Sequence, residues 1–468
     1  MVKIWLKSFY AKAGSWLSRN NDKNKRLLLF WFRAVYVTAF SFFLMWAFSG
    51  LFSLNLFNAF DPVGQALSDF ELTDYAFSNL REDPKAEERI VLVNIGHISR
   101  AEVAQEINII RKYKPKVIGI DAFYNCEGGL RDSVNCPQLL DTLSNLMLSD
   151  AIEQAGNVVL DSKLLQKTAT ALNPPSDVYF DSAEYSDPMF TRYATSAFAN
   201  FPSEAEYQED VKQCRTFFPR ISVNGKYENS FAVELVRRYD STKLKKLFDR
   251  GIDEEIINYR GNVELMNVKL KELANKDIET TNFHVMFYAI DINKVMAGDF
   301  DSLLFKDKIV LMGYLGNYFG DPSWEDKWFT PLNKKVAGRA NPDMFGVVIH
   351  ANIISMILNQ DYVDQIPDWA TYLTAIILGI LTVALFRIID KKLPMWYDAM
   401  QVSIQVVQII LISIVMVWAF VLFTYKIDLT LSMAVCALVG PSYDFLKPLE
   451  GEDKENKSVE NSSSSLPK

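Results

Sequence analysis

The sequence predicts an α/β domain with a largely parallel sheet and crossover helices, joined to an α-helical membrane region. Two observations lead to this fold class. Between residues 58 and 368, short runs of β-branched and other apolar residues alternate with segments whose apolar residues recur at helical spacing. This alternation is typical of parallel strands joined by helices. Outside this range, four segments are almost free of charge, and such segments are candidates for membrane spans.

The chain begins with a basic segment, residues 1–33, which contains eight Lys or Arg residues and only one acid, Asp22. The first apolar segment follows at residues 34–57, and it is long enough for a helix that crosses a bilayer. Its apolar run also exceeds the roughly 7–15 residues of a signal-peptide core, so we expect an uncleaved signal anchor. The positive-inside rule places the basic segment in the cytoplasm.

Three further apolar segments predict membrane helices at residues 369–388, 402–424 and 429–446. Pro441 interrupts the last of them, which leaves a re-entrant or interfacial helix as the alternative. Arg387, Lys391 and Lys392 place the loop between the second and third segments in the cytoplasm. If all four segments span, both termini are cytoplasmic and residues 58–368 form an extracytoplasmic domain. The acidic, serine-rich tail, residues 447–468, is predicted to be disordered.

The extracytoplasmic domain supplies the elements of the predicted α/β fold. Strands are expected at residues 89–96, 116–123, 157–162, 254–261 and 306–313. Helices are expected at residues 99–113, 136–156, 230–240 and 346–360. Residues 163–215 are polar and aromatic without a clear period, so we expect loops with short elements there.

Polar residues follow several of these strands. Ligands of open parallel sheets bind beyond the carboxyl ends of the strands, so we take the residues at these ends as candidate ligand-binding residues: His97, Ser99, Asp121, Tyr124, Tyr314 and Asn317, with Asp161 and Asp321 nearby.

A metal or acid–base cluster of His97, Asp121 and Asp326 is one reading of these residues, because imidazole and carboxylate groups serve both purposes. The other reading is structural: Asp121 caps a helix or bonds loop amides, and His97 is a polar turn residue. His350 begins an apolar helix, and we expect a structural hydrogen bond for it rather than catalysis. The sequence contains no HExxH pair and no GxSxG elbow.

Residues 306–321 begin like a phosphate-binding loop, because a buried strand leads into Gly313, Gly316 and Gly320. They lack the GK[ST] of a P-loop and the GxGxxG of a dinucleotide site. An aromatic, acidic segment follows instead of a helix with free amides. We therefore expect no nucleotide and no other cofactor.

Cys126 and Cys136 enclose a glycine-containing loop of the extracytoplasmic domain. An oxidising compartment would permit a disulfide between them, and we treat the two as a candidate pair. No CxxC spacing is present, so we expect no metal at the cysteines.

Several stretches resemble, in order, the CHASE-two (CHASE2) domain, the second type of cyclase- and histidine-kinase-associated sensory extracellular domain. Early matches are "IVLVNIGHIS", "VIGIDAFY" with Asp121, "GNVVL" and "INYRG". The three final matches are the most specific together: "DKIVLMGYLG", "EDKWFTPL" with Asp326, Thr330 and Pro331, and "GVVIHANII" with His350 and Asn352. The resemblance covers about residues 61–361. It adds Asp326, Thr330 and His350 to the candidate ligand-binding residues.

Two departures from the family pattern concern the first strand. The family's acidic pair is replaced by Gly96 and His97, and its Trp-Pro-rich turn before the first helix is absent. We therefore expect a different ligand at that edge. The family usually carries a cytoplasmic output domain after its membrane helices, whereas only about twenty residues follow them here, too few to fold as an enzyme.

The resemblance and the apolar segments lead to three hypotheses. The first is an inner-membrane, outward-facing sensor-like protein, not itself an enzyme, which detects a small-molecule or envelope signal and acts through a separate membrane or cytoplasmic protein partner. The second is a scaffolding subunit of an envelope complex, with the Tyr- and Phe-rich residues 163–215 as its contact face. The third is a metal-dependent hydrolase at His97, Asp121 and Asp326. We expect contact with the lipid bilayer and none with nucleic acid, and an oligomer is compatible with the sequence.

Overall fold

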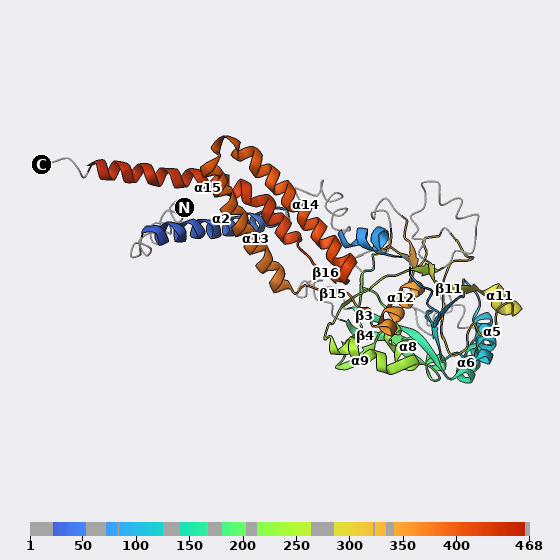
Figure 1. Ribbon diagram of the computed structural model, residues 1–468. Coiled ribbons are helices and arrows are strands. Elements are labelled where there is room, and N and C mark those ends of the chain that lie inside the picture. Colours follow the sequence, from blue (N-terminus) through green and yellow to red (C-terminus); the bar gives the residue numbers. More distant parts are fainter. Residues whose placement is uncertain are drawn as a thin grey trace. The chain divides into compact units, whose positions relative to one another are not determined.

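The structure is a computed structural model that describes residues 22–52, 72–82, 84–124, 141–166, 180–202, 213–263, 285–321, 323–333 and 341–463. The chain forms two compact units. The α/β unit comprises residues 65–363, and the second unit comprises residues 1–64 and 364–468; we call it the membrane unit because it contains the candidate membrane-spanning helices. Figure 1 shows the elements of both units.

The α/β unit is built around an eight-stranded sheet with the strand order β10-β11-β1-β12-β2-β3-β4, in which β5 also pairs with β3. All of its pairs are parallel except β3–β4, which confirms the predicted, largely parallel sheet. The strands are β1 (Ile90–Asn94), β2 (Val117–Ile120), β3 (Val158–Gln166), β4 (Phe180–Tyr185), β5 (Thr195–Phe198), β10 (Asn262–Val263), β11 (Val285–Asp291) and β12 (Ile309–Gly313).

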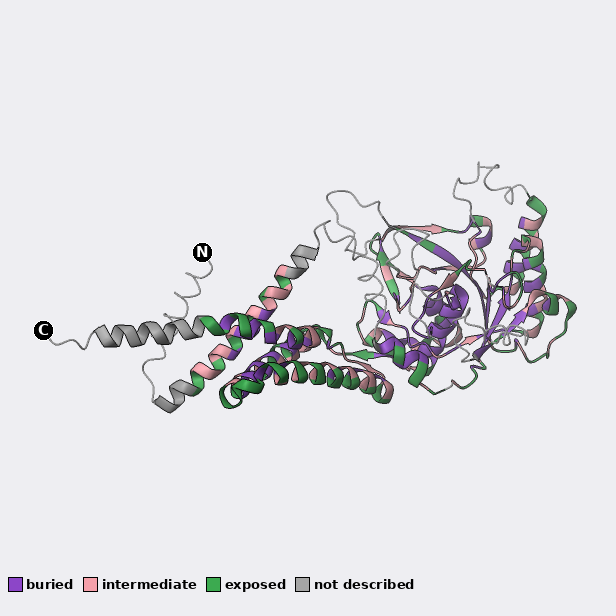
Figure 2. Ribbon diagram, turned by 90° about the horizontal axis from the view of Figure 1, so that it is seen from above, coloured by how far each residue is buried: buried purple, intermediate pink, exposed green. Residues whose placement is uncertain are grey.

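The central strands form because nearly all of their residues are apolar, with the polar Asn94 at the end of β1. All residues of β1, β2 and β12 are buried, as expected for parallel strands that are covered on both faces. Figure 2 shows the central strands in the colour of buried residues. The burial of both faces explains why these strands read as continuous apolar runs and not as alternating ones.

Helices cover the two faces of the sheet. On one face, α5 (Arg100–Ile110), α6 (Thr142–Ala155) and α11 (Ile292–Ala297) share a core with alternate strand residues such as Val93 and Ile120. On the other face lie α8 (Phe231–Asp240) and α12 (Gly346–Asn359). Glycines let these two helices approach the sheet: a Cβ on Gly119 would lie 2.8 Å from Leu235 of α8, and one on Gly313 would lie 2.7 Å from Val347 of α12.

The predicted strand at residues 254–261 is wrong in part. Only β9 (Glu255–Ile256) is extended there, and it pairs with β6 (Thr216–Phe217) outside the main sheet. The backbone N–H groups of Arg260 and Gly261 donate to the side chain of Asn352 on α12 instead of to a neighbouring strand. These side-chain bonds take the place of the ladder bonds that a strand would need.

Shorter elements complete the α/β unit. They are α4 (Leu72–Tyr75), the π-helix η3 (Ala76–Leu80), the 3-10 helices η4 (Arg111–Tyr113) and η6 (Ser241–Lys243), α7 (Pro188–Thr191), α9 (Leu244–Asp249), and the antiparallel pairs β7 (Arg220–Val223) with β8 (Lys226–Asn229) and β13 (Lys327–Trp328) with β14 (Met344–Phe345). The part of residues 163–215 that the structure describes contains the end of β3, β4, α7 and β5, so this segment holds more strand than its sequence predicts.

The membrane unit consists of the four helices α2 (Asp22–Phe52), α13 (Asp368–Lys392), α14 (Tyr397–Phe423) and α15 (Thr430–Ser463), with the one-turn helix η7 (Pro394–Trp396) and the short parallel pair β15 (Asp364–Gln365) and β16 (Tyr425–Lys426). Among the described residues, three helical segments are long and apolar enough to cross a membrane: Leu27–Ala47, Asp368–Lys392 and Pro394–Phe423.

Helix α15 differs from the sequence prediction in two ways. It contains residues 430–446 of the predicted fourth span, 429–446. It is not among the three apolar segments of the described chain, since Pro441, Ser442 and Asp444 interrupt its apolar run. It also continues to Ser463, where the sequence predicts a disordered tail from residue 447. This part is rich in Glu and Lys, which favour helix once a helix has begun.

Small side chains allow the helices of the membrane unit to pack closely. A Cβ on Gly379 of α13 would lie 2.7 Å from Thr38 of α2 and 2.9 Å from Val435 of α15. The buried hydroxyl of Ser41 on α2 donates to that of Ser442 on α15 over 2.8 Å. Such small-residue contacts and interhelical hydrogen bonds are typical of helix packing in membranes.

Candidate functional site

One row of residues crosses the sheet at its carboxyl edge. The register pairs Asp291 of β11 with Asn94 of β1, and Asn94 with Gly313 of β12. On β2 and β3, Ile120 pairs with Leu160, so the next residues, Asp121 and Asp161, are neighbours. The backbone N–H of Asp121 donates to the carbonyl of Met312 over 2.8 Å. The carboxyl groups of Asp121, Asp161 and Asp291 therefore lie at the carboxyl edge of the parallel sheet.

This row faces the α12 side of the sheet. Gly313 belongs to the row and lies against Val347 in the first turn of α12, and residues in register on neighbouring strands point to the same face. Asp326 joins the group from the loop before β13: its carboxylate oxygens lie 3.2 and 3.3 Å from the position of a Cβ on Gly346. Glycine at the start of α12 thus leaves space for a carboxylate beside Asp121 and Asp161.

Asp161 is the most conspicuous member of this acidic edge, which we define as Asp121, Asp161 and Asp326. Its side chain is buried, and its Oδ1 atom has no hydrogen-bond partner among the residues that the structure describes. Burial raises the pKa of Asp161 to about 7; the charge of Lys163 opposes this shift and that of Asp326 adds to it. A buried carboxyl oxygen without a partner is costly, which makes it a candidate contact for a ligand.

The carboxyl groups of the acidic edge shift one another's pKa values. Burial, followed by the charges of Asp326 and Asp161, raises the pKa of Asp121 well above its usual range. Neighbouring carboxyl groups do not all ionise readily, because each negative charge disfavours the ionisation of the next group. The edge therefore holds protons at a pH where isolated carboxylates have lost them, and a ligand that donates hydrogen bonds or carries positive charge would relieve the repulsion.

His97 lies beside Glu325, an acid that was not among the predicted site residues. Its Nε2 atom is 3.1 Å from Oε2 of Glu325, and its ring is tilted against that of Tyr314 with centroids 4.8 Å apart. The Tyr314 hydroxyl donates to the same Glu325 oxygen over 3.2 Å. Burial and the Glu325 charge raise the pKa of Tyr314 to about 12. Two predicted site residues thus converge on Glu325, within the quoted motif "EDKWFTPL" and next to Asp326.

Three predicted site residues stabilise local structure. Ser99 caps α5 in a capping box with Glu102. Asn317 donates to Asp321 from its backbone and its side chain, over 3.0 and 2.9 Å. Thr330 donates to Asp343 from its backbone N–H over 2.9 Å and from its hydroxyl over 2.6 Å. Their hydrogen bonds shape the loops at this edge.

Tyr124 and His350 are buried away from solvent. The Tyr124 ring packs against Phe190, and its hydroxyl has no partner within the described part of the chain. The His350 ring packs between Phe201 and Phe231, with centroids 4.5 and 5.1 Å away. Burial lowers the pKa of His350 to about 3. The predicted structural hydrogen bond is not found at its Nδ1 atom, which has no partner among the described residues, because aromatic rings surround it.

The predicted metal cluster is not formed. Within the described ranges, no group of three or more His, Cys, Asp or Glu side chains is placed to hold a metal ion. His97 contacts Glu325, while Asp121 and Asp326 belong to the acidic edge, so the three residues do not converge on one point. The candidate disulfide residues Cys126 and Cys136 lie outside the described residues.

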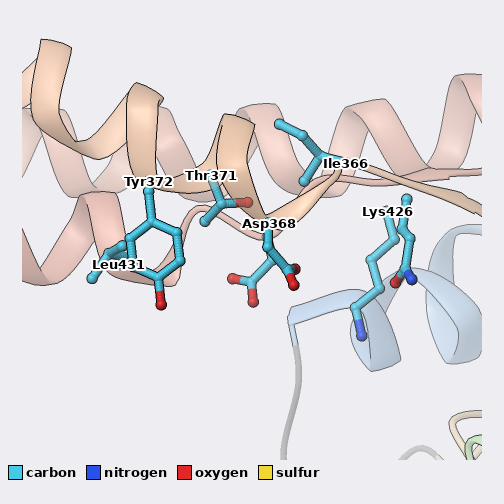
Figure 3. A pocket seen from close by; sticks show the side chains of 8 residues that line it. Ile366, Asp368, Thr371, Tyr372, Lys426 and Leu431 are labelled. Atoms are coloured by element: carbon cyan, nitrogen blue, oxygen red, sulfur yellow. The ribbon is translucent and has the colours of Figure 1, made fainter.

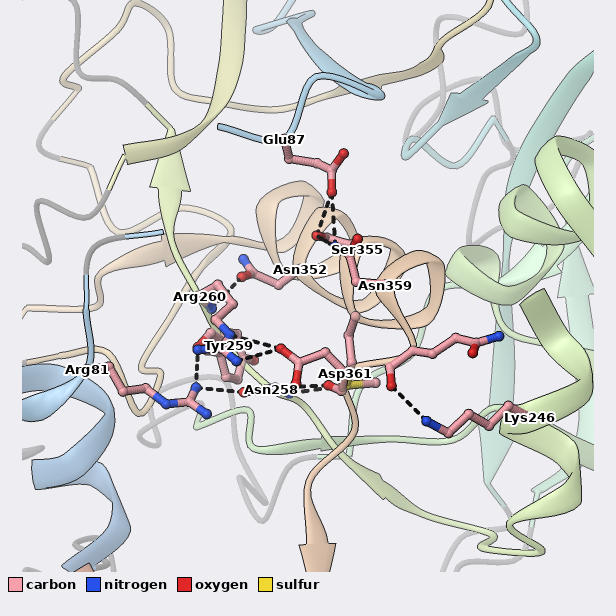
Figure 4. Close-up of polar contacts among 12 residues, drawn as sticks. Arg81, Glu87, Lys246, Asn258, Tyr259, Arg260, Asn352, Ser355, Asn359 and Asp361 are labelled. Atoms are coloured by element: carbon pink, nitrogen blue, oxygen red, sulfur yellow. Dashed lines mark hydrogen bonds and ion pairs between the residues drawn. The ribbon is translucent and has the colours of Figure 1, made fainter. Parts of the chain in front are cut away.

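A second polar network lies at the opposite, amino edge of the sheet, where α12 ends (Figure 4). Arg81 donates to the side chain of Asn258 over 2.6 Å and to the carbonyl of Tyr259 over 3.1 Å. Arg260 pairs with Asp361 over 2.5 Å. Burial and then the charge of Arg260 lower the pKa of Arg81 to about 9, and Asp361 opposes this shift. The network ties the beginning of the α/β unit to its end.

Glu87 joins the C-terminal half of α12 to the strand β1. It accepts hydrogen bonds from Ser355 over 2.9 Å and from Asn359 over 3.3 Å (Figure 4). It also pairs with Arg89 over 2.6 Å. The hydrogen bonds with Arg89 and Ser355 keep the pKa of Glu87 below its usual range, although burial opposes this. α12 is therefore held at both of its ends, by packing against the acidic edge and by hydrogen bonds at the amino edge.

The comparisons with known proteins agree with this architecture. The family model of the CHASE2 domain, an extracellular sensory domain, matches residues 43–386. No curated protein and no solved structure matches the chain. The matched range covers most of the chain and contains the acidic edge, α12 and the amino-edge network, so the chain belongs to the CHASE2 domain family.

Proposed function

We propose that this protein is an integral membrane sensor, with its α/β unit outside the cytoplasm, that binds a small extracytoplasmic ligand at the acidic edge and acts through a separate protein partner. The observation that carries the proposal is the buried Asp161 oxygen without a partner, placed beside two more carboxyl groups at the ligand-binding edge of a parallel sheet. Membership of a sensory domain family supports it.

The ligand side of the proposal follows from the chemistry of this edge. Carboxyl and carboxylate oxygens accept hydrogen bonds, and ionised carboxylates attract positive charge. We infer a small ligand with N–H or O–H donors, placed within reach of Asp121, Asp161 and Asp326. His97, Tyr314 and Glu325 border the same edge and belong to the proposed site as its more exposed rim.

Helix α12 supports a route from the ligand to the amino edge. Its first residue, Gly346, contacts Asp326, and its last turns carry Ser355 and Asn359, which bond Glu87. Thirteen of its fourteen residues are buried, and a helix of this length spans roughly 20 Å. A ligand that moves Asp326 would displace a packed helix that ends at the network of Arg81 and Asp361.

The membrane part of the proposal places both termini in the cytoplasm. It is supported by the three apolar helices and by the basic residues of the N-terminal segment and of the loop at Lys391 and Lys392. At the end of the helices that contains this loop, Tyr443 and Lys447 of α15 contact Asp390 of α13 over 3.1 and 2.6 Å. A partner in the cytoplasm would meet α13 and α15 at this end.

The test uses the purified full chain in lipid nanodiscs. Thermal unfolding is followed against a panel of amines, amino acids, sugars and carboxylic acids, in parallel for the unaltered protein, Asp161→Asn and the exposed control Asp249→Asn. We expect at least one donor-bearing compound to raise the melting temperature of the unaltered protein and the control but not of Asp161→Asn. The absence of any shift, or an equal shift in all three proteins, contradicts the proposed site.

The separate partner has its own test. Affinity capture of the tagged full chain from native membranes should recover a stoichiometric second protein. Chemical crosslinks should form at the end of the bundle that carries the exposed Lys391 and Lys392. Crosslinks that form only on the α/β unit would favour the scaffolding alternative.

A further inference from the structure

A cavity of about 450 Å³ opens in the membrane unit at the beginning of α13 and α15. Its lining includes the carboxylates of Asp368 and Asp428, the ammonium group of Lys426, the hydroxyls of Thr371 and Tyr372, and the apolar side chain of Leu431. Figure 3 shows the polar ends of Asp368, Tyr372 and Lys426 projecting to the same side. The cavity thus combines two anionic groups, one cationic group and two hydroxyls.

The backbone holds this cavity in place. The segments that precede α13 and follow α14 form the parallel pair β15–β16, in which the N–H of Ile366 donates to the carbonyl of Lys426 over 3.1 Å. Asp428 accepts a hydrogen bond from the N–H of Thr430 over 2.9 Å at the start of α15. Lys426 therefore belongs to a strand ladder, and Asp428 caps the beginning of α15, so neither residue lies in an unstructured loop.

The cavity lies where the apolar helices begin and end. The apolar segment of α13 starts at Asp368, and that of α14 ends at Phe423. Next to it, α13 exposes large apolar and aromatic side chains in an unbroken series, Trp369, Tyr372, Leu373, Ile376 and Ile377. Trp and Tyr at such positions mark the interface of a membrane with water. In a bilayer, acyl chains along this face would bring their headgroups to the cavity.

We propose that this cavity binds the headgroup of a zwitterionic phospholipid that ends in a primary ammonium group. The ammonium would donate hydrogen bonds to Asp368 and Asp428, and the phosphate would accept from Lys426. Two carboxylates against one ammonium disfavour an anionic headgroup, because one cation does not offset both acids. A quaternary ammonium lacks N–H donors, so it would lose the hydrogen bonds to the carboxylates. This inference goes beyond the proposed sensing function and depends on it only for the membrane location.

The experiment measures lipid binding to the detergent-solubilised full chain by native mass spectrometry. Phosphatidylethanolamine, phosphatidylcholine and phosphatidylglycerol with identical acyl chains are offered at equal concentrations. We expect phosphatidylethanolamine to bind about tenfold more tightly than the other two, which corresponds to the loss of one charge-assisted hydrogen bond. Equal binding of the three lipids overturns the proposal, as does a preference for phosphatidylglycerol.

Matched variants locate the preference. Asp368→Asn and Asp428→Asn keep the shape of each side chain, and an Asn at residue 428 can still accept the hydrogen bond of Thr430. We expect each variant to lose most of the preference for phosphatidylethanolamine, while Asp398→Asn, an exposed acid at the other end of α14, retains it. An unchanged preference in both cavity variants refutes the site even though the lipid binds.

A final arm distinguishes a lipid from a free headgroup. Free phosphoethanolamine is added to the protein that carries bound phosphatidylethanolamine. We expect no displacement at equal concentration, because the acyl chains add apolar burial against α13. Displacement at equal concentration would assign the cavity to a soluble ligand and overturn the lipid proposal. None of these results depends on ligand binding at the acidic edge, so the two proposals fail independently.

Discussion

Replacing Asp161 with Asn should flatten the dependence of stability on pH. Burial raises the pKa of Asp161 from about 3.8 to about 7. Between these two values, the folded protein holds a proton that the unfolded chain has released, so the free energy of unfolding falls as the pH rises. The full penalty, reached above pH 7, is three pKa units at 1.36 kcal/mol each, or about 4 kcal/mol. Asp161 is only 7% exposed, so solvent screening reduces this value little.

The assay compares Asp161→Asn with the unaltered full chain in detergent at pH 5, 6, 7 and 8. Hydrogen exchange of the β3 amides reports the local free energy of opening. Relative to the unaltered protein, the variant should gain about 1.4 kcal/mol per pH unit between pH 5 and 7, and the gain should level off above pH 7. The gain at pH 8 falls below 4 kcal/mol, because a buried Asn also needs partners.

The prediction concerns the difference in stability between Asp161→Asn and the unaltered protein at each pH. Burial also raises the pKa of Asp343 to about 7 and that of Glu106 to about 8, and both carboxyl groups make the unaltered protein less stable at high pH in the same direction. These contributions cancel when the variant is compared with the unaltered protein. A difference between the two that stays constant from pH 5 to pH 8 refutes the reasoning about Asp161.

Four further predictions concern other parts of the chain. Arg81→Ala should destabilise residues 72–80 by about 2–3 kcal/mol in hydrogen exchange, because buried partners lose a charged donor. Arg81→Lys should recover only part of this loss, and full recovery would show that the guanidinium group is not required. His350→Phe should leave the melting temperature unchanged or higher, since aromatic rings surround the site, and a clear decrease would reveal a missed polar partner. Gly379→Leu should destabilise the helix bundle by about 1–3 kcal/mol in detergent melting, unlike exposed Leu381→Ala. Alkaline phosphatase fused after residue 60 or 427 should be active and after 393 or 463 inactive; activity after 463 would place the C-terminus outside.

The central strands could be predicted because their composition leaves no alternative. β1, β2 and β12 are short, almost entirely apolar and rich in Ile and Val, which favours buried parallel strands. β4 and β5 lie toward one end of the sheet and contain polar residues such as Asp181 and Ser196, so their sequences resemble loops. β11 was not predicted, although its run of apolar residues is typical of a buried strand.

The candidate site could be predicted only in part. The rule that ligands bind beyond the carboxyl ends of parallel strands predicted Asp121 as a site residue and placed Asp161 near it. The register that makes these two acids neighbours depends on how the strands pair, and one sequence does not contain that pairing. Glu325 was missed because its role comes from His97 and Tyr314, which reach it across 228 and 11 residues of chain.

The short ladder of β15 and β16 has a mechanical consequence for α13 and α14. The turn η7 connects the two helices at one end, and the ladder joins the segments beyond their other ends, with the N–H of Asp364 bonded to the carbonyl of Thr424 over 3.2 Å. The two helices are therefore connected at both ends, by η7 at one and by the β15–β16 ladder at the other. Sliding of one helix along the other would break the hydrogen bonds of this ladder, so such a movement is coupled to the opening of β15 from β16.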